Sequence, residues 1–218
     1  MPKEKKLFKR LREEMVATQI EARGITDKRT LDAMRRVPRH LFVSEALENR
    51  AYGDHPLPIR ERQTISQPFI VAEMTQALAP GPDDRVLEVG TGSGYQAAVL
   101  AELAFRVYTI ERIHSLFTES RRRFDRLGCH NIVSRYSDGA EGWPDESPFD
   151  AIIVTAGAPD IPDPLVRQLA EGGRMVIPVG GRTTQELVKI EKLGDEIRKT
   201  RMGGCRFVPL IGGHGWAV

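Results

Sequence analysis

A glycine-rich stretch carries the clearest chemical signal in this sequence. Residues 85 to 112 read RVLEVGTGSGYQAAVLAELAFRVYTIER, and Gly90, Gly92 and Gly94 stand between an apolar run and an Ala-rich helical pattern. A strand, a tight turn and a helix in this order can bring backbone N–H groups against a nucleotide. The dinucleotide pattern G-x-G-x-x-G is not met, because position 95 is tyrosine, and no Gly-Lys-Ser/Thr follows as a P-loop requires. The glycines alone are therefore a weak signal.

Acidic residues at the predicted strand ends strengthen the signal. Glu111 ends the second strand, 21 residues after Gly90, where a carboxylate can accept hydrogen bonds from both hydroxyls of a ribose. Asp138 and Gly139 end the third strand, where a loop would meet an adenine. Glu88 lies in the first strand near the glycine loop, placed for an ammonium group. Each feature alone also fits a plain turn or a surface acid, but their order favours one ligand with ribose, adenine and an amino-acid moiety and no phosphate, S-adenosyl-L-methionine.

The predicted cofactor-binding residues are Glu88, Gly90, Thr91, Gly92, Gly94, Glu111, Arg112, Asp138 and Gly139.

The elements that must position these residues follow from the spacing of apolar residues. Residues 5 to 50 are charged and helical in period, residues 51 to 69 form a structured loop, and a helix is expected from Phe69 to Leu78. From residue 85 onward, short apolar runs alternate with helical segments, which predicts parallel strands joined by crossover helices. The predicted strands are RVLEVG (85–90), RVYTIE (106–111), NIVSRYS (131–137), DAIIVTAG (150–157), GRMVIPVG (173–180), ELVKIEK (186–192) and RFVPLIG (206–212). Short turns separate the last three, so antiparallel pairing is expected there.

The expected fold class is α/β, a Rossmann-like S-adenosylmethionine-dependent methyltransferase fold. It has a doubly wound, mostly parallel seven-stranded sheet with an antiparallel end and an N-terminal helical extension. We expect residues 1–80 to form the helical extension and active-site loop, and residues 81–218 the cofactor-binding α/β domain, in one compact unit. In the extension, Leu7, Leu11 and Met15 recur at helical spacing and predict the apolar face of the first helix.

The residues near the predicted site favour an acceptor that is already ionised. After the fourth strand the chain reads VTAGAPDIP, without the Asn/Asp-Pro-Pro-aromatic motif of many amino-group methyltransferases. No His or Lys cluster beside the loop offers a general base. A carboxylate has a pKa near about 4 and needs no base at neutral pH, so catalysis would reduce to orientation and desolvation.

Several longer segments make the sequence recognisable. They are QTISQP (63–68), VLEVGTGSGYQAAVLAEL (86–103), IER (110–112), DGAEGWP (138–144), FDAIIVTAGAPDIPDPLVRQLAEGGRMVIPVG (149–180) and RFVPLIGGHGW (206–216). From about residue 12 to the C-terminus the chain resembles the protein-L-isoaspartate (D-aspartate) O-methyltransferases. The glycine loop is shared by methyltransferases at large, whereas QTISQP and RFVPLIG…GW are specific to this family.

The resemblance implies a protein-repair enzyme and a set of substrate-side residues. The family methylates the free α-carboxylate of isoaspartyl residues in damaged proteins and peptides, and the ester then collapses to a succinimide. On the family pattern Ser66 is the active-site residue, Thr64 and Ile65 form the wall between cofactor and peptide, and Gln67 is also on the substrate side. Ser66 would donate a hydrogen bond that orients one carboxylate oxygen. Ser-Gln-Pro before an apolar helix also predicts that Ser66 caps that helix.

Two departures from the family pattern concern the same site. Family members often have glycines just before QTIS, where this chain has Arg60 and Arg62, and charged side chains there could alter how the loop closes. Ser137 replaces the first glycine of the usual GDG, while Asp138 is retained. His214 is expected at the surface and Trp216 as a packing residue; we assign neither to catalysis.

Composition limits the remaining possibilities. The net charge of +2, from 32 basic and 30 acidic residues, gives no reason to expect nucleic-acid binding. Cys129 and Cys205 lack metal-ligand spacing and are expected to be free thiols, and no metal site is predicted. No apolar stretch is long enough for a membrane span, so we expect a soluble, cytoplasmic protein, and a monomer. Two alternatives stay open: a methyltransferase of a small carboxylic acid, and a cofactor-binding relative without catalysis.

Overall fold

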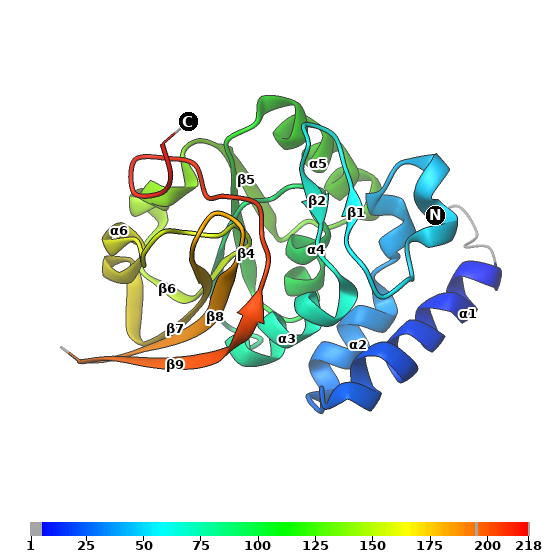
Figure 1. Cartoon of the computed structure of the whole chain (residues 1–218), viewed down its shortest axis with the longest axis horizontal. Helices are drawn as coiled ribbons and strands as arrows, with labels where there is room; N and C mark the ends of the chain where they lie inside the picture. The colour runs from blue at the N-terminus through cyan, green and yellow to red at the C-terminus, as the bar shows by residue number, and fades with distance from the viewer. Residues whose placement is uncertain (1–5, 195, 218) are drawn as a thin grey trace.

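A seven-stranded sheet with helices on both faces dominates the computed structural model, which describes residues 6–194 and 196–217 (Figure 1). Its strands are β3 (Arg85–Val89), β4 (Arg106–Glu111), β5 (Ile132–Tyr136), β6 (Phe149–Val154), β7 (Leu169–Gly180), β8 (Gln185–Leu193) and β9 (Glu196–Cys205). The order across the sheet is β5-β4-β3-β6-β7-β8-β9, with parallel pairing from β5 to β7 and antiparallel pairing of β8 with both neighbours. The predicted fold class is confirmed, and the strand order reverses between β3 and β6, where ligands bind in such sheets.

The helices are α1 (Lys6–Glu14), α2 (Lys28–Arg36), α3 (Pro68–Leu78), α4 (Tyr95–Ala101), α5 (His114–Leu127) and α6 (Asp163–Arg167). One hydrophobic cluster joins α3, α4 and α5 to the sheet through Met74, Leu100 and Phe124, and α6 packs in the cluster on the opposite face through Leu165. Short segments of π- or 3-10 helix cover Met15–Ile20, Glu21–Arg23, Arg39–Phe42, Glu45–Arg50, Gly139–Glu141 and Pro144–Glu146. No helix in the described part of the chain is both long and apolar enough to cross a bilayer.

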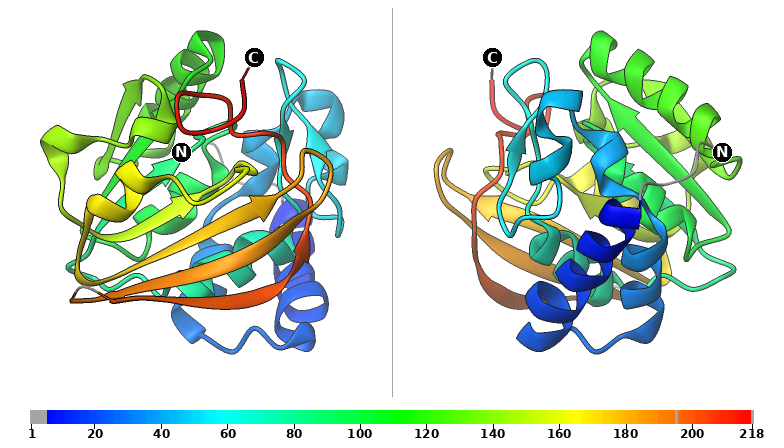
Figure 2. Two further views of the ribbon diagram at one scale, coloured as in Figure 1. Left: turned by 60° about the vertical axis from the view of Figure 1, so that its left-hand side comes forward. Right: turned by 90° about the vertical axis from the view of Figure 1, so that its right-hand side faces the viewer.

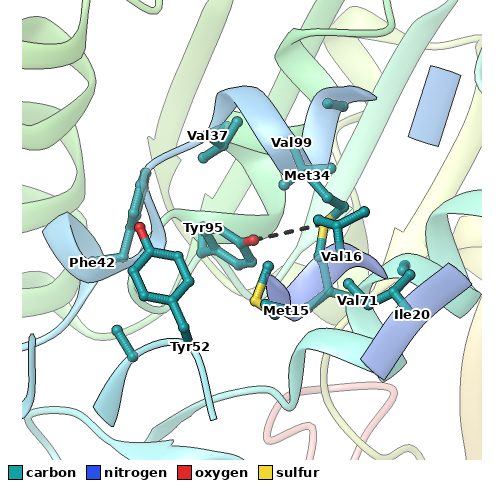
Figure 3. Close-up of a cluster of buried hydrophobic side chains, with 14 of the residues drawn as sticks. Met15, Val16, Ile20, Met34, Val37, Phe42, Tyr52, Val71, Tyr95 and Val99 are labelled. Atoms are coloured by element: carbon teal, nitrogen blue, oxygen red, sulfur yellow. Dashed lines mark hydrogen bonds between the residues drawn. The ribbon is translucent and has the colours of Figure 1, made fainter. Parts of the chain in front are cut away.

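The N-terminal helices form a further layer against α3 and α4 (Figure 2). Figure 3 shows apolar side chains of this layer, Met15 and Met34 among them, gathered around Tyr95 at the start of α4. The Tyr95 hydroxyl donates to Met34 Sδ at 3.6 Å. The α1 residue buried in this cluster is Phe8, whereas Leu7 is 47% exposed, so the prediction that Leu7 faces the core is wrong. Residues from both predicted parts, 1–80 and 81–218, therefore contribute to one cluster.

The last strand lies earlier in the chain than the sequence suggested. We expected residues 206–212 to be the seventh strand, but β9 is Glu196–Cys205, and this prediction is wrong. Most β9 side chains are exposed because the strand is at the edge of the sheet, so it lacks the apolar alternation of a buried strand. The segment 206–212 contains Pro209, which cannot donate a ladder hydrogen bond, and it leaves the sheet with an isolated bridge to Gly157.

A short hairpin precedes α3. Its strands are β1 (Leu57–Pro58) and β2 (Thr64–Ile65), paired antiparallel. The connecting turn places two residues in the left-handed region, Glu61 at φ 59° and Arg62 at φ 56°. Turns with two positive φ values favour Asn and Gly, because longer side chains are strained there. Of the two arginines noted in the sequence, Arg62 is thus at a position that disfavours its side chain, whereas Arg60 is not in the left-handed region.

Replacing Arg62 by glycine should stabilise the protein. We expect Arg62→Gly to raise the free energy of unfolding by up to about 1 kcal/mol, because it relieves the left-handed strain at that position. Arg62→Ala is the matched control, since it removes the same charge and keeps the strain. Chemical denaturation of both variants decides the cause: an equal gain in Arg62→Ala would show that charge, and not backbone strain, is responsible.

Candidate active site

One cavity at the carboxyl ends of β3, β4 and β6 brings most of the predicted site residues together. Of those residues, Thr64, Ile65, Ser66, Gly90, Thr91, Gly92, Glu111, Arg112 and Gly139 line it. The hairpin and the start of α3 form one wall, and the glycine loop forms another. The segment 207–211, which runs past Gly157 beyond β6, forms a third wall. Four predicted residues, Glu88, Gly94, Asp138 and Gln67, do not line the cavity.

The first two glycines of the loop line the cavity. Gly90 has φ +97° and Gly92 has φ +52°, both in the left-handed region. A Cβ on Gly90 would lie 2.5 Å from Thr155 Oγ1, and that hydroxyl donates to the Gly90 carbonyl at 2.6 Å. A Cβ on Gly92 would lie 3.8 Å from Ile59 of the hairpin, so this wall packs directly over the loop. The backbone at both positions borders the cavity closely.

Gly94 has a packing role. It is the residue before α4, at φ +88°, and a Cβ there would lie 2.7 Å from the Phe124 ring of α5. The third glycine is therefore required for α4 and α5 to pack together. The expectation that it borders the ligand is not met.

Glu111 ends β4 with its carboxylate on the cavity wall. Gly92 N donates to Oε2 at 2.8 Å and Ile113 N donates to Oε1 at 2.9 Å. Burial raises the pKa of Glu111, and these backbone hydrogen bonds oppose the shift. Each carboxylate oxygen has a second lone pair, so the two oxygens can still accept from a vicinal diol.

Glu88 lies beneath the loop and not beside the ligand. Its side chain is fully buried, Thr109 donates to its Oε2, and Thr109 Oγ1 is in turn hydrogen-bonded to Thr91 of the loop. Burial raises the pKa of Glu88 to about 8. The prediction of direct contact with an ammonium group is therefore wrong in this structure. The carboxyl instead supports the loop through the two threonines.

Asp138 holds the C-terminal segment. Its Oδ1 accepts from Ala140 N at 2.9 Å and its Oδ2 accepts from Gly213 N at 2.7 Å. The side chain borders a neighbouring groove, while Gly139 borders the cavity itself. His214 is exposed, and Trp216 donates from Nε1 to the Gly157 carbonyl at 3.0 Å, in keeping with a packing role.

Ser66 connects the hairpin to α3. The residue before the first turn of α3 is Gln67, and no side chain caps the helix, so the prediction that Ser66 is the cap is wrong. The cap is absent because α3 begins at Pro68, one residue later than a Ser66 cap would require. Gln67 points away from the cavity and donates to Asp54 Oδ1 at 2.8 Å. The Ser66 hydroxyl makes no hydrogen bond to the residues that the structure describes.

Other lining residues escaped the sequence analysis. They include Tyr95, Gln96, Thr155, Ala156, Phe207 and Val208. Thr155 and Ala156 stand in the segment that we noted as lacking an amine-binding motif. Phe207 and Val208 stand in the RFVPLIG motif, which we assigned to a strand, and that motif was the available signal for a third wall.

The cavity is poor in cations and bases. Arg112 is its sole basic side chain among the described residues, and no described His or Lys lines it. Within residues 6–194 and 196–217, no three His, Cys, Asp or Glu side chains gather as a metal site. The cavity has two glycine backbones and a carboxylate that can accept from a diol, and its described lining has no cluster of basic residues for a phosphate. This combination suits S-adenosylmethionine, which has a ribose and no phosphate.

Sequence comparison places these features in a known family. The family described as protein-L-isoaspartate(D-aspartate) O-methyltransferase matches residues 9–215. A protein-L-isoaspartate O-methyltransferase of Desulfosudis oleivorans is 63% identical over 99% of this chain and 98% of its own length. One of Syntrophus aciditrophicus is 59% identical over 96% of this chain and 98% of its own length.

Solved structures agree with the sequence comparison. A protein-L-isoaspartate O-methyltransferase structure superposes with a TM-score of 0.85 at 28% identity, covering 94% of this chain and 67% of that chain. A Plasmodium falciparum structure described as the same enzyme, in complex with S-adenosyl-L-homocysteine, gives a TM-score of 0.78 at 28% identity, covering 92% of this chain and 98% of that chain.

Substituting Gly90 should damage both stability and cofactor binding. We expect Gly90→Ala to lower the free energy of unfolding by about 3 kcal/mol, because a left-handed alanine is strained and its Cβ meets Thr155. Gly172→Ala is the control, since Gly172 has φ +71° and open space around it, so only the backbone cost of about 1 kcal/mol applies. Urea denaturation and calorimetry with S-adenosylhomocysteine measure the difference. Equal losses in both variants, with cofactor binding intact, would contradict the close approach.

Stability should depend on pH through Glu88. The pKa of Glu88 is raised to about 8 by burial, so its protonated form stabilises the fold fully below its ordinary pKa, and this contribution is lost as pH rises toward about 8. The free energy of unfolding of the wild type should therefore fall relative to that of Glu88→Gln between about pH 5 and pH 8. Denaturant titrations across this range test the difference, and parallel pH profiles would show that Glu88 is ionised in the folded protein.

Proposed function

The chain belongs to the protein-L-isoaspartate (D-aspartate) O-methyltransferase family, and we propose that the cavity between the glycine loop and Ser66 is its methyl-transfer site. The enzyme is a protein-repair methyltransferase that uses S-adenosylmethionine. Its acceptor is the free α-carboxylate of an L-isoaspartyl residue in a damaged protein or peptide. D-aspartyl residues are a second acceptor suggested by the family description.

The cofactor side of the cavity is formed by the glycine loop and β4. In this proposal the Gly90 to Gly92 backbone borders the amino-acid part of the cofactor, Glu111 accepts from the ribose hydroxyls, and Gly139 borders the adenine. When bound, S-adenosylmethionine supplies an electrophilic methyl group on a sulfonium sulfur. Asp138 acts indirectly, by holding the C-terminal segment at Gly213.

The observation that carries the proposal is that Ser66 lines the same cavity, and that its hydroxyl makes no hydrogen bond within the described chain. A carboxylate acceptor is ionised at neutral pH, so it needs orientation and not deprotonation. Ser66 can donate its proton in a hydrogen bond to one carboxylate oxygen, which leaves the other oxygen to attack. A cavity without a described His or Lys is consistent with a reaction that needs no general base.

The hairpin excludes water from the reacting groups. Ile65 is 3% exposed, and Ile59 lies against the glycine loop at Gly92. Removing water strengthens the attraction between a carboxylate and a sulfonium and prevents competing hydrolysis. The hairpin thus serves as the apolar wall that the family pattern assigns to Thr64 and Ile65.

We also propose that the enzyme acts as a monomer in the cytoplasm. Both cysteines are free, and burial raises the pKa of Cys205 to about 11, so its thiol stays protonated at neutral pH. Free, unreactive thiols suit a reducing compartment. Size-exclusion chromatography with light scattering tests the monomer.

Two synthetic peptides that differ only in an isoaspartyl or a normal aspartyl linkage test the function. With methyl-labelled S-adenosylmethionine, base-labile methyl ester should form on the isoaspartyl peptide alone. Label on neither peptide, while calorimetry shows bound cofactor, would contradict repair and favour a small carboxylic acid or a protein without catalysis.

Removing the Ser66 hydroxyl tests the proposed role of that residue. Ser66→Ala should lower kcat/KM for the isoaspartyl peptide by about tenfold to a hundredfold, as loss of one hydrogen bond to a charged group predicts, with an unchanged Kd for S-adenosylhomocysteine. Ser147→Ala, before β6 at the opposite end of the sheet, is the matched control. A wild-type kcat/KM in Ser66→Ala would remove Ser66 from the mechanism.

A further inference from the structure

Arg39 is an unusual residue for a protein core. It is fully buried, and it is the largest such side chain in the described chain. Burial lowers its pKa to about 10, so the guanidinium remains charged at neutral pH. No described acid forms an ion pair with it, although buried charges are normally paired. The burial of this charge without an ion-pair partner therefore has to be explained by its other contacts.

The guanidinium contacts two backbone carbonyls and one aromatic ring. Arg39 Nε donates to the Ala51 carbonyl at 2.8 Å, and Nη2 donates to the Ser66 carbonyl at 2.8 Å. Its Cζ lies 4.8 Å from the centroid of the Tyr95 ring, and Tyr95 lines the cavity. Nη1 makes no hydrogen bond to the residues described. Arg39 therefore links the helical extension to two walls of the cavity, the hairpin side at Ser66 and the glycine-loop side at Tyr95.

Ser66 has little else to hold it. Its hydroxyl makes no hydrogen bond to the described chain, no side chain caps α3, and Pro68 cannot donate an N–H. The hairpin before it carries a strained turn at Glu61 and Arg62. In the part of the chain that the structure describes, the bond from Arg39 is the one hydrogen bond that Ser66 makes.

We propose that Arg39 is a positioning residue, which fixes the Ser66–Gln67 peptide so that the Ser66 hydroxyl meets the acceptor carboxylate. The fork of a guanidinium suits this task, because it holds two carbonyls in one fixed geometry and a lysine ammonium does not. The inference rests on the proposed function of Ser66 and adds the group that aims it. Arg39 itself touches neither substrate nor cofactor.

Arg174, which contacts the C-terminal end of α3, provides a control for Arg39. Arg174 donates from Nε to the Leu78 carbonyl and from Nη2 to the Ala79 carbonyl, both at 2.6 Å, where α3 ends. Each arginine thus holds a carbonyl beside one end of α3, and neither lines the cavity. They differ in that Arg174 also pairs with Asp84 at 2.6 Å and contacts the end of α3 remote from Ser66. A general loosening of α3 should appear in Arg174→Lys as well, whereas an effect through Ser66 should not.

The test compares Arg39→Lys, Arg39→Gln and Arg174→Lys in the full chain. For the two Arg39 variants we expect kcat/KM for the isoaspartyl peptide to fall by about tenfold or more, as a misplaced orienting group predicts, with an unchanged calorimetric Kd for S-adenosylhomocysteine. Arg174→Lys should keep both values. Arg39→Gln carries no charge to bury, so it covers the case in which Arg39→Lys does not fold.

A double-mutant cycle with Ser66→Ala separates positioning from structural support. If Arg39 acts through Ser66, adding Ser66→Ala to Arg39→Lys should lower kcat/KM little further, whereas independent effects would multiply. Hydrogen exchange of the amides at 64–67 gives a readout besides activity, and it should be faster in Arg39→Lys than in Arg174→Lys.

Three results would overturn the proposal. They are multiplicative losses of kcat/KM in the double mutant, an equal loss of kcat/KM in Arg174→Lys, and loss of cofactor binding in both Arg39 variants. The last would show that Arg39 supports the whole site and not Ser66. A wild-type protein that leaves the isoaspartyl peptide unmethylated would instead overturn the proposed function.

Discussion

The absence of space for a side chain at Gly90 is the constraint on which the site depends. At the carboxyl end of β3 the chain turns into α4 at φ +97°, and Thr155 from beyond β6 approaches so closely that only glycine fits. This contact occurs where the sheet reverses its strand order, so the connections that follow β3 and β6 run to opposite faces of the sheet and leave a cavity between them. Glu111 and the hairpin then enclose the same cavity from its other sides. The position of the cavity is thus a consequence of backbone packing.

Around this cavity the fold buries polar and charged side chains and holds them with hydrogen bonds. Glu88 supports the glycine loop from below through Thr109, and Arg123 donates from Nη1 to the Ser93 carbonyl of that loop at 2.6 Å. On the opposite wall, Arg39 donates to the Ser66 carbonyl. Buried groups of this kind stabilise little by themselves, because desolvation offsets their interactions. Their effect is to hold flexible loop segments in one arrangement, which a reaction that depends on orientation requires.

The fold and most of the cavity lining could be predicted from the sequence, because both depend on local sequence signals. Apolar runs and glycine spacing predicted the parallel strands and the loop, and residues of the QTISQP motif line the cavity. The errors concern positions that tertiary structure decides. The edge strand β9 has no apolar alternation to detect, and the burial of Glu88 depends on what packs beside β3. The positioning role proposed for Arg39 could not be predicted from the sequence, because it depends on a contact with Ser66, 27 residues away.

Methyl transfer to a carboxylate needs little acid–base chemistry, and the cavity contains few groups that could perform it: a serine hydroxyl, the Glu111 carboxylate and an apolar wall. The most direct test of this account is a crystal structure with S-adenosylhomocysteine and an isoaspartyl peptide. The account predicts the ribose on Glu111, the sulfur between the glycine loop and Ser66, and a peptide carboxylate oxygen within hydrogen-bond distance of the Ser66 hydroxyl. A ligand in the outer groove beside Asp138, or a peptide carboxylate remote from Ser66, would contradict it.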